Sequence, residues 1–228
     1  MAHSHNDGDT CCQSNNYDVY ETLDEMKFAR GLWKAAMDGD FNRVQSLLGR
    51  QYDPREVDSA GYTPLHYAAR NGHSDVCGML LSNGANPDAR TRSLNATPLH
   101  RAALNGHFET VETLLNYRAN ANLMDADGKT ALHRAITKYV SSKETLQDTS
   151  LSKTCKLLLP RTNLNIKDNT GQTLKKFILE TYKKTLDELG PEDAELMKDS
   201  FLQLALERYC LSCGQKKPAT MWELPDDI

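Results

Sequence analysis

Long apolar segments are absent from this 228-residue sequence. No run approaches the roughly 20 residues that a helix needs to cross a bilayer, so we expect no membrane span. The first residues, MAHSHNDGDTCCQSNN, are polar and contain no apolar stretch, which argues against a signal or transit peptide. We therefore expect a protein of the cytoplasm, the nucleus or both.

A strong excess of charge is also lacking. The 27 basic and 31 acidic side chains give a formal net charge of -4. A protein that binds nucleic acid by neutralising phosphates carries a clear basic excess, so this balance argues against a nucleic-acid partner. The six cysteines are scattered, and without a secretory signal we expect them to be reduced thiols.

Recognisable catalytic motifs are missing as well. The sequence contains no P-loop, no GxSxG, no HExxH and no dinucleotide-binding fingerprint. We therefore expect no catalytic residues and no cofactor, and we interpret the protein as a non-enzyme.

What the sequence does contain is a repeat. The segment AGYTPLHYAARNGH at residues 60–73 returns as NATPLHRAALNGH at residues 95–107. The anchoring threonines of the two segments, Thr63 and Thr97, are 34 residues apart, and TALH begins 33 residues later at Thr130. A period of this length indicates a repeat architecture.

The same register extends in both directions from these three copies. It reaches back to Arg30 and forward, after ten additional residues, to Thr173. Five copies therefore span about residues 25–189. The additional residues form an insertion at about 139–150, within the fourth copy.

TPLHYAARNGH, followed by VCGMLLSNGAN, resembles the ankyrin repeat, whose period is about 33 residues. The resemblance implies an all-α fold with short β-hairpin turns: a solenoid of about five stacked helix pairs, followed by a C-terminal helical cap. One such unit cannot bury its own apolar face, so neighbouring copies must stack.

The residues at the turns and helix ends of copy two agree with the structure expected of an ankyrin repeat. Gly61 suits a tight turn, because glycine adopts the positive φ that such turns need. Thr63 can cap the first helix, and Pro64 suits its first position, where no amide donor is lost. Gly72 ends this helix. Arg118 stands where the glycine after the second helix would be, as Gly84 is in copy two, and it predicts local strain.

Copies two, three and four each contribute one histidine at the same position, namely His66, His100 and His133. In a solenoid these side chains lie a repeat apart, whereas metal ligands must converge within a few ångströms of one ion. The resemblance implies that each imidazole links the neighbouring threonine to the backbone. We therefore interpret all three as structural.

The sequence predicts four regions. Residues 1–24 are expected to be a disordered polar tail and residues 25–189 the ankyrin repeat domain. Gly190 and Pro191 are expected to end one helix and start another, so that residues 190–211 form a C-terminal helix and residues 212–228 a tail. We interpret Trp33, in the first copy, as a core residue that caps the stack.

Ankyrin domains bind proteins through their hairpin tips and the face of their first helices. The resemblance therefore implies a non-enzymatic scaffold or adaptor whose partner is another protein. We expect the chain to be a monomer. Tyr62, Arg70, Leu94 and Leu104 are the expected anchors, flanked by Tyr67 and Arg101. The full predicted binding set is Ser59, Ala60, Tyr62, Arg70, Asn71, Ser93, Leu94, Ala96, Leu104, Asn105, Asp127, Lys129, Thr137 and Lys138.

Two alternatives rest on the C-terminus. The segment CLSC, with Cys210 and Cys213, resembles half of a zinc knuckle, and a zinc-binding module would need further ligands such as those of the N-terminal tail. The segment ALERYC resembles the Leu-x-x-x-Cys box of SOCS-box proteins. That resemblance implies that Leu206 and Cys210 insert into elongin C, which would make the chain a substrate adaptor of a ubiquitin ligase.

Overall fold

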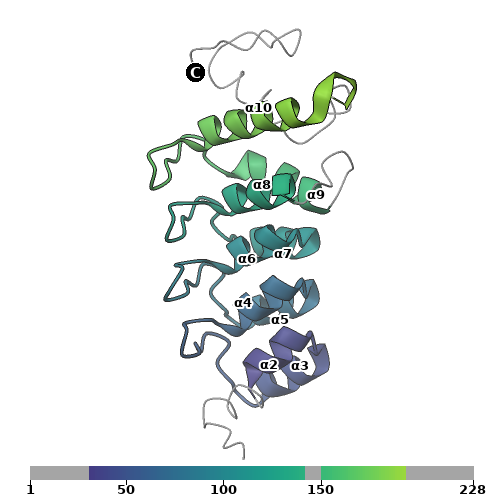
Figure 1. Ribbon diagram of the computed structural model, residues 1–228. Coiled ribbons are helices and arrows are strands. Elements are labelled where there is room, and N and C mark those ends of the chain that lie inside the picture. The colour runs from purple at the N-terminus through teal and green to yellow at the C-terminus, as the bar shows by residue number, and fades with distance from the viewer. Residues whose placement is uncertain (1–30, 142–149, 194–228) are drawn as a thin grey trace, which may run out of the picture.

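The computed structural model describes residues 31–141 and 150–193. These residues form an elongated stack in which each copy of the repeat adds one layer (Figure 1). The helix pairs are α2 (Leu32–Asp38) with α3 (Phe41–Gly49), α4 (Pro64–Asn71) with α5 (Ser74–Ser82), α6 (Pro98–Asn105) with α7 (Phe108–Asn116), and α8 (Ala131–Ser141) with α9 (Ser150–Leu158). A 3-10 turn, η1 (Leu159–Arg161), and one long helix, α10 (Leu174–Asp193), follow. The ankyrin-type helical solenoid expected from the sequence is confirmed.

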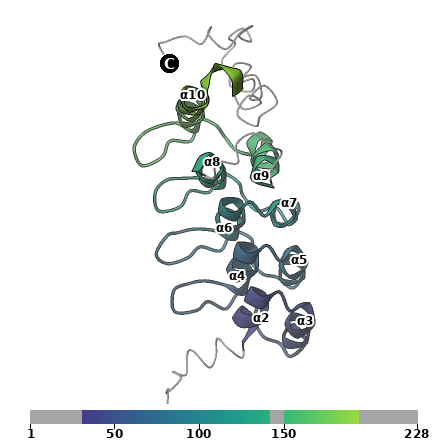
Figure 2. The same ribbon diagram turned by 45° about the vertical axis from the view of Figure 1, so that its right-hand side comes forward.

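The helices form two columns. The first helices α2, α4, α6 and α8 contact one another in series and α10 packs on α8, while α3, α5, α7 and α9 form the second column. Figure 2 shows the two columns side by side, with the hairpin turns projecting from the first column. Small residues such as Ala68, Ala69, Ala102 and Ala103 are fully buried between neighbouring layers, which lets the helices approach closely.

The helix boundaries follow local chemistry. Thr63 lies at the N-cap of α4 with Pro64 in the first turn, and Thr97 has the same place before α6. Gly72 and Gly106 end these helices in the left-handed conformation, with φ of 82° and 71°. In this region of φ a side chain is strained, so glycine is the favoured residue.

The turns between copies are hairpins held by a few backbone hydrogen bonds. The amide of Asp58 donates to the carbonyl of Tyr62 at 3.0 Å, and the amide of Asp125 to that of Lys129 at 2.9 Å. Gly61 and Asn95 adopt positive φ of 82° and 50° in these turns. Among the described residues the hairpins form no strands beyond an isolated bridge between Lys167 and Thr173.

The fourth copy departs from this pattern where its first helix should end. Tyr139 stands where copies two and three have Gly72 and Gly106, and it is buried, with 2% of its surface exposed. Without the glycine the helix continues, so α8 runs to Ser141. Part of the predicted insertion at 139–150 is therefore helical: residues 139–141 belong to α8, and Ser150 begins α9.

The fifth copy contributes a hairpin and the single helix α10. We expected Gly190 and Pro191 to end a helix, and this prediction is wrong, because α10 continues through both residues to Asp193. Pro191 removes one amide donor, but it lies near the helix end, where only a short segment depends on that bond. The rest of the predicted C-terminal helix, and the tails at 1–24 and 212–228, lie outside the described residues.

At the other end of the stack, Trp33 is 7% exposed, so its interpretation as a core residue is confirmed. None of the helices within the described ranges combines the length and the apolar character that a membrane crossing demands.

Candidate functional site: the inner face

We use the term inner face for the surface formed by the hairpin turns and the exposed side chains of α4, α6 and α8. In copies two and four the hairpin keeps its shape through an aspartate at its base. Asp58 Oδ1 accepts hydrogen bonds from the amides of Ala60 and Tyr62 at 2.9 and 2.8 Å. Asp125 Oδ1 accepts those of Asp127 and Lys129 at 2.9 and 3.0 Å. A carboxylate that accepts backbone amides in this way imposes the turn on its own residues.

Neighbouring hairpins are also joined to one another. One backbone hydrogen bond links each pair: Arg92 to Ala60 at 3.2 Å, Ala126 to Leu94 at 2.9 Å, and Asn169 to Asp127 at 3.3 Å, with the amide donor named first. The third hairpin contains one additional residue, Ser93, yet the bonds on both of its sides are kept. The tips therefore form a regular row (Figure 2).

The repeated histidines fasten each first helix to its hairpin. His66 Nδ1 accepts from the amide of Thr63 at 3.1 Å and lies 2.8 Å from its hydroxyl, and His100 makes the same contacts with Thr97. The other ring nitrogen then carries the proton. His66 Nε2 donates to the carbonyl of Ala96, in the next copy, at 3.1 Å.

His133 keeps the contact with Thr130 but has no acceptor for Nε2 among the described residues. The ring of Phe177, on α10, lies 5.2 Å from that of His133 instead. Burial lowers the pKa of His66 and of His133 to about 4, and it also lowers the pKa of His100. All three imidazoles are therefore neutral at physiological pH, as struts within the stack should be.

Tyr62 is the centre of a packed aromatic group. Its ring centroid lies 5.6 Å from those of His66 and Tyr67. The guanidinium of Arg101, from the next copy, lies over the Tyr62 ring at 5.2 Å from its centroid, and Nη2 donates to the Tyr62 hydroxyl. Tyr62, one of the predicted anchors for a partner, is half-buried and supports Arg101 through these contacts.

The other predicted residues of the binding set are mostly exposed. Ser59, Ala60, Arg70, Asn71, Ser93, Leu94, Asn105, Asp127, Thr137 and Lys138 are exposed, whereas Leu104 and Lys129 are half-buried. Leu94 has the most prominent apolar side chain at a hairpin tip, with 44% of its surface exposed. The structure therefore leaves most of the predicted set accessible from solvent.

One member of the set is wrong. Ala96 is only 5% exposed, because it lies at the return of the third hairpin, where its carbonyl accepts from His66 and its amide donates to Thr91 Oγ1 at 3.1 Å. Asn105 also has a structural task, because its side-chain amide donates to the carbonyl of Arg70 at 2.7 Å. Asn71 makes the equivalent bond to Met37.

The sequence analysis missed Arg134. Its Nε donates to Asp125 Oδ2 at 2.7 Å and its Nη2 to Asp127 Oδ2 at 2.6 Å, so this guanidinium joins α8 to the fourth hairpin. The sequence signal was available: an aspartate at the hairpin base precedes, by nine residues, a hydrogen-bond donor on the first helix. Asp58 and Tyr67 have the same spacing.

Sites for metals or reactive thiols are not found in the part of the chain that the structure describes. No group of three or more His, Cys, Asp or Glu side chains there is placed to hold a metal ion. Burial raises the pKa of the Cys77 thiol to about 12 and also raises that of Cys155, so neither is a ready nucleophile. Cys210, Cys213 and Leu206, on which the zinc and ligase alternatives rest, lie outside the described residues.

Comparison with known proteins agrees with this geometry. A family model described as ankyrin repeats, in three copies, matches residues 6–91 and 88–168, which is most of the chain. The chain belongs to the ankyrin repeat family. Ankyrin repeats are, as a family, protein interaction modules.

Individual relatives match shorter segments. Human ankyrin repeat domain-containing protein 39 is 53% identical over 83 residues, which cover 36% of this chain and 45% of that protein. The bovine protein of the same name is 60% identical over 55 residues, or 24% of this chain and 30% of that protein. Zebrafish palmitoyltransferase ZDHHC17 is 34% identical over 129 residues, 57% of this chain but 20% of that protein. The chain thus matches less than half the length of each of these relatives.

Proposed function

We propose that this chain is a non-enzymatic scaffold or adaptor that binds a partner protein through the inner face. The proposal is supported by which side chains are buried and which are exposed. The alanines, leucines and histidines of each copy are buried and hold the stack together, whereas the hairpin tips and the outward positions of α4, α6 and α8 are exposed. Exposed positions on a rigid scaffold can differ from copy to copy without harm to the core.

Leu94 is the observation that carries this proposal. It lies at the tip of the third hairpin, beside the additional residue Ser93, and nearly half of its surface is exposed. A large apolar side chain in this place contributes little to folding, because few protein atoms cover it. The desolvation of such a side chain by a partner is favourable, and residues of this kind dominate the energy of many interfaces.

A capture experiment tests the proposal. The wild-type chain, Leu94→Ser and Tyr117→Ser are immobilised, and the proteins that each retains from a cell lysate are identified by mass spectrometry. Tyr117, at the end of α7, is the matched control, because it is 43% exposed and lies away from the inner face. We expect Leu94→Ser to reduce retention of a specific partner by about tenfold, while stability changes by no more than about 0.5 kcal/mol.

Equal retention by wild type and Leu94→Ser, with loss in Tyr117→Ser, would place the interaction on the outer side of the stack. Equal retention by all three variants would show that neither exposed apolar residue takes part. Loss of the partner by Leu94→Ser together with a large fall in its unfolding midpoint would mean that Leu94 belongs to the core. Each of these results contradicts the proposal.

A further inference from the structure

Three equivalent residues on α4, α6 and α8 face the hairpins, and two of them are bound to a carboxylate. Tyr67 donates through its hydroxyl to Asp58 Oδ2 at 2.6 Å. Arg134 donates through Nε to Asp125 Oδ2 at 2.7 Å. In both copies the acceptor is the aspartate at the base of the same copy's hairpin, so the donor and the acceptor satisfy each other.

The third copy lacks this acceptor. Thr91 stands at the base of its hairpin, and the Thr91 hydroxyl accepts the amide of Ala96 at 3.1 Å, which replaces the turn-forming role of the aspartate but not its charge. Arg101, the residue equivalent to Tyr67 and Arg134, is half-buried. Its Nε is buried and has no hydrogen-bond partner among the described residues, although the same atom of Arg134 binds a carboxylate.

Arg101 is instead held by Tyr62. The guanidinium lies over the Tyr62 ring, and Nη2 donates to the Tyr62 hydroxyl. These contacts fix the orientation of the guanidinium and leave its positive charge without a neutralising partner in the described part of the chain. A cation held in this way over an aromatic ring is prepared for a carboxylate, because little side-chain entropy remains to be lost on binding.

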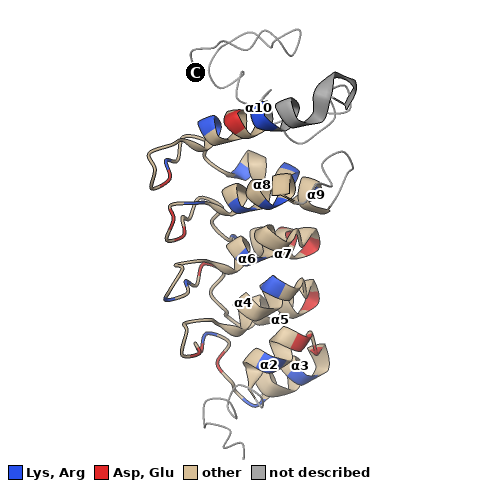
Figure 3. Cartoon of the chain, in the orientation of Figure 1, with Lys and Arg blue, Asp and Glu red and all other residues tan. Residues whose placement is uncertain are grey.

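The three first helices around Arg101 carry charges of the same sign. Helices α4, α6 and α8 contain the cations Arg70, Arg101, Arg134 and Lys138, and no aspartate or glutamate. Arg134 is neutralised by Asp125 and Asp127, but Arg70 and Lys138 are exposed and form no ion pair within the described residues. In Figure 3 acidic segments lie in the hairpins, on α10, which includes Glu180, and on outer helices such as α7, whose acids include Glu109 and Glu112.

We propose that the inner face binds an acidic peptide segment of its partner, and that Arg101 receives one aspartate or glutamate carboxylate of that segment. An Arg–carboxylate pair can form two parallel N–H···O bonds, which makes it stronger and more directional than a pair with lysine. Arg70 and Lys138 supply longer-range attraction for further acids along the peptide. This inference rests on the function proposed above and gives the partner its chemistry.

The decisive variant is Thr91→Asp. It gives the third copy the residue that the other hairpins already have, and we expect the new carboxylate to bind Arg101 as Asp125 binds Arg134. The charge of Arg101 is then neutralised within the chain, although Arg101 itself is unchanged. Thr91→Asn is the matched control, because the asparagine side chain has nearly the same shape as that of aspartate but carries no charge.

The test uses a phage-displayed library of random linear peptides, selected separately on the wild-type chain, Thr91→Asp, Thr91→Asn and Arg101→Gln. We expect the wild type and Thr91→Asn to enrich peptides rich in Asp and Glu. An enriched peptide, fluorescently labelled, should bind Thr91→Asp and Arg101→Gln at least about tenfold more weakly than the wild type, as loss of a buried charge pair predicts. Its affinity for the wild type should fall as salt is added.

The outcomes separate this inference from the proposed function. Peptides that bind at the inner face but show no acidic preference would overturn the inference and leave the proposed function intact. Acidic peptides that bind wild type and Thr91→Asp equally would overturn the role of Arg101. Absence of any selected peptide, together with unchanged lysate capture in Leu94→Ser, would contradict both. Thermal unfolding of each variant shows whether a loss of binding has a trivial cause, and Arg101→Lys provides a second test should Thr91→Asp not fold.

Discussion

Copies three and four begin in the same way and end differently. Both start their first helix after a threonine that is bound to a histidine, Thr97 with His100 and Thr130 with His133. In copy three, Gly106 then ends α6, whereas in copy four the buried ring of Tyr139 occupies the same position and α8 continues. The same position of the repeat is therefore occupied by a glycine that ends the helix in copy three and by a large buried side chain in copy four.

The junctions between copies show what must be kept when the residues change. His107 Nε2 donates to the carbonyl of Arg70 at 3.0 Å, which fastens copy three to copy two. Copy four has no such histidine, and the hydroxyl of Ser150 donates to the carbonyl of Gly106 instead, with Leu151 packed against that glycine. The exposed end of each first helix needs a donor for its carbonyls, and residues of different kinds can supply it.

The largest expected effect comes from Tyr139→Gly, which gives copy four the residue of copies two and three. Because the Tyr139 ring fills the core that α8 forms with its neighbours, we expect a loss of about 3 to 5 kcal/mol of stability. Urea or thermal unfolding measures this loss. Lys138→Gly is the control, since Lys138 is exposed on the same helix and should cost only about 1 kcal/mol. Similar losses in the two variants would show that the Tyr139 ring is not needed.

A smaller effect follows from the buried histidines. The folded-state pKa of His66 and of His133 is about 4, below the ordinary 6.5, so the unfolded chain binds more protons between these values. Stability is therefore complete above pH 6.5 and falls as the pH is lowered towards 4. Between about pH 7.5 and 5.5 the two residues together should remove about 3 kcal/mol, measured by unfolding at each pH. A flat profile over this range would contradict the buried neutral state.

The two histidines also differ in a way that substitution can reveal. A glutamine at either position can still accept the hydrogen bond from the threonine amide. His66→Gln removes the hydrogen bond from Nε2 to the Ala96 carbonyl. His133→Gln removes no such bond, because Nε2 of His133 has no acceptor among the described residues. We therefore expect His66→Gln to destabilise the protein by about 1 kcal/mol more than His133→Gln. Equal losses would mean that the bond between copies two and three contributes nothing.

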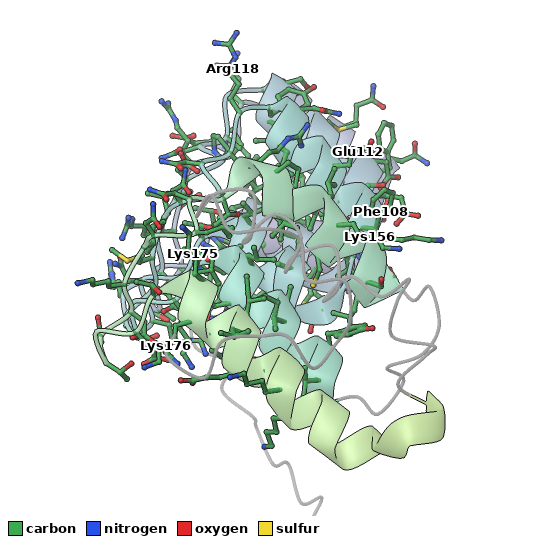
Figure 4. All side chains as sticks on the ribbon, turned by 90° about the horizontal axis from the view of Figure 1, so that it is seen from above. Phe108, Glu112, Arg118, Lys156, Lys175 and Lys176 are labelled. Atoms are coloured by element: carbon green, nitrogen blue, oxygen red, sulfur yellow. The ribbon has the colours of Figure 1, made fainter. Side chains whose placement is uncertain are left out.

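The smallest effect concerns the residue after the second helix. Gly84 has φ of 91° in copy two, and Arg118 has φ of 64° in copy three. Arg118 projects away from the ribbon (Figure 4), so its side chain gives little in return for the strained backbone. Arg118→Gly should stabilise the protein by about 0.5 kcal/mol, and Gly84→Ala should destabilise it by about 1 kcal/mol. An Arg118→Gly variant of lower stability would contradict the expected strain.

The fold was predictable wherever a residue acts on its own neighbours. Thr63, Pro64 and Gly72 set the limits of α4 by local rules, and the strain at Arg118 follows from a side chain at a position where copy two has Gly84. The stacking of Tyr62 under Arg101 was not predictable in this way, because the two residues come from different copies and lie 39 residues apart. The continuation of α10 through Pro191 was missed because a local rule was applied too strictly.

The inner face was predicted in part for the same reason. The repeat register indicates which positions point outward, and most of them are exposed. The repeat register does not indicate which contacts those side chains make with one another, as the burial of Ala96 and the pairing of Arg134 with Asp125 show. The sequence shows that copy three has Thr91 in place of the aspartate. That this leaves Arg101 without a carboxylate is evident only when Arg101 is compared with Tyr67 and Arg134 in the structure.

The additional residue Ser93 has a consequence for engineering. The third hairpin is one residue longer than its neighbours, yet its backbone bonds to the hairpins before and after it are formed as elsewhere in the row. Loop length and layer spacing are therefore independent at this point of the molecule. A short labelling sequence inserted beside Ser93 would stand next to Leu94, within the proposed binding surface, without shifting the layers, so that a label at this turn would report whether that surface is occupied.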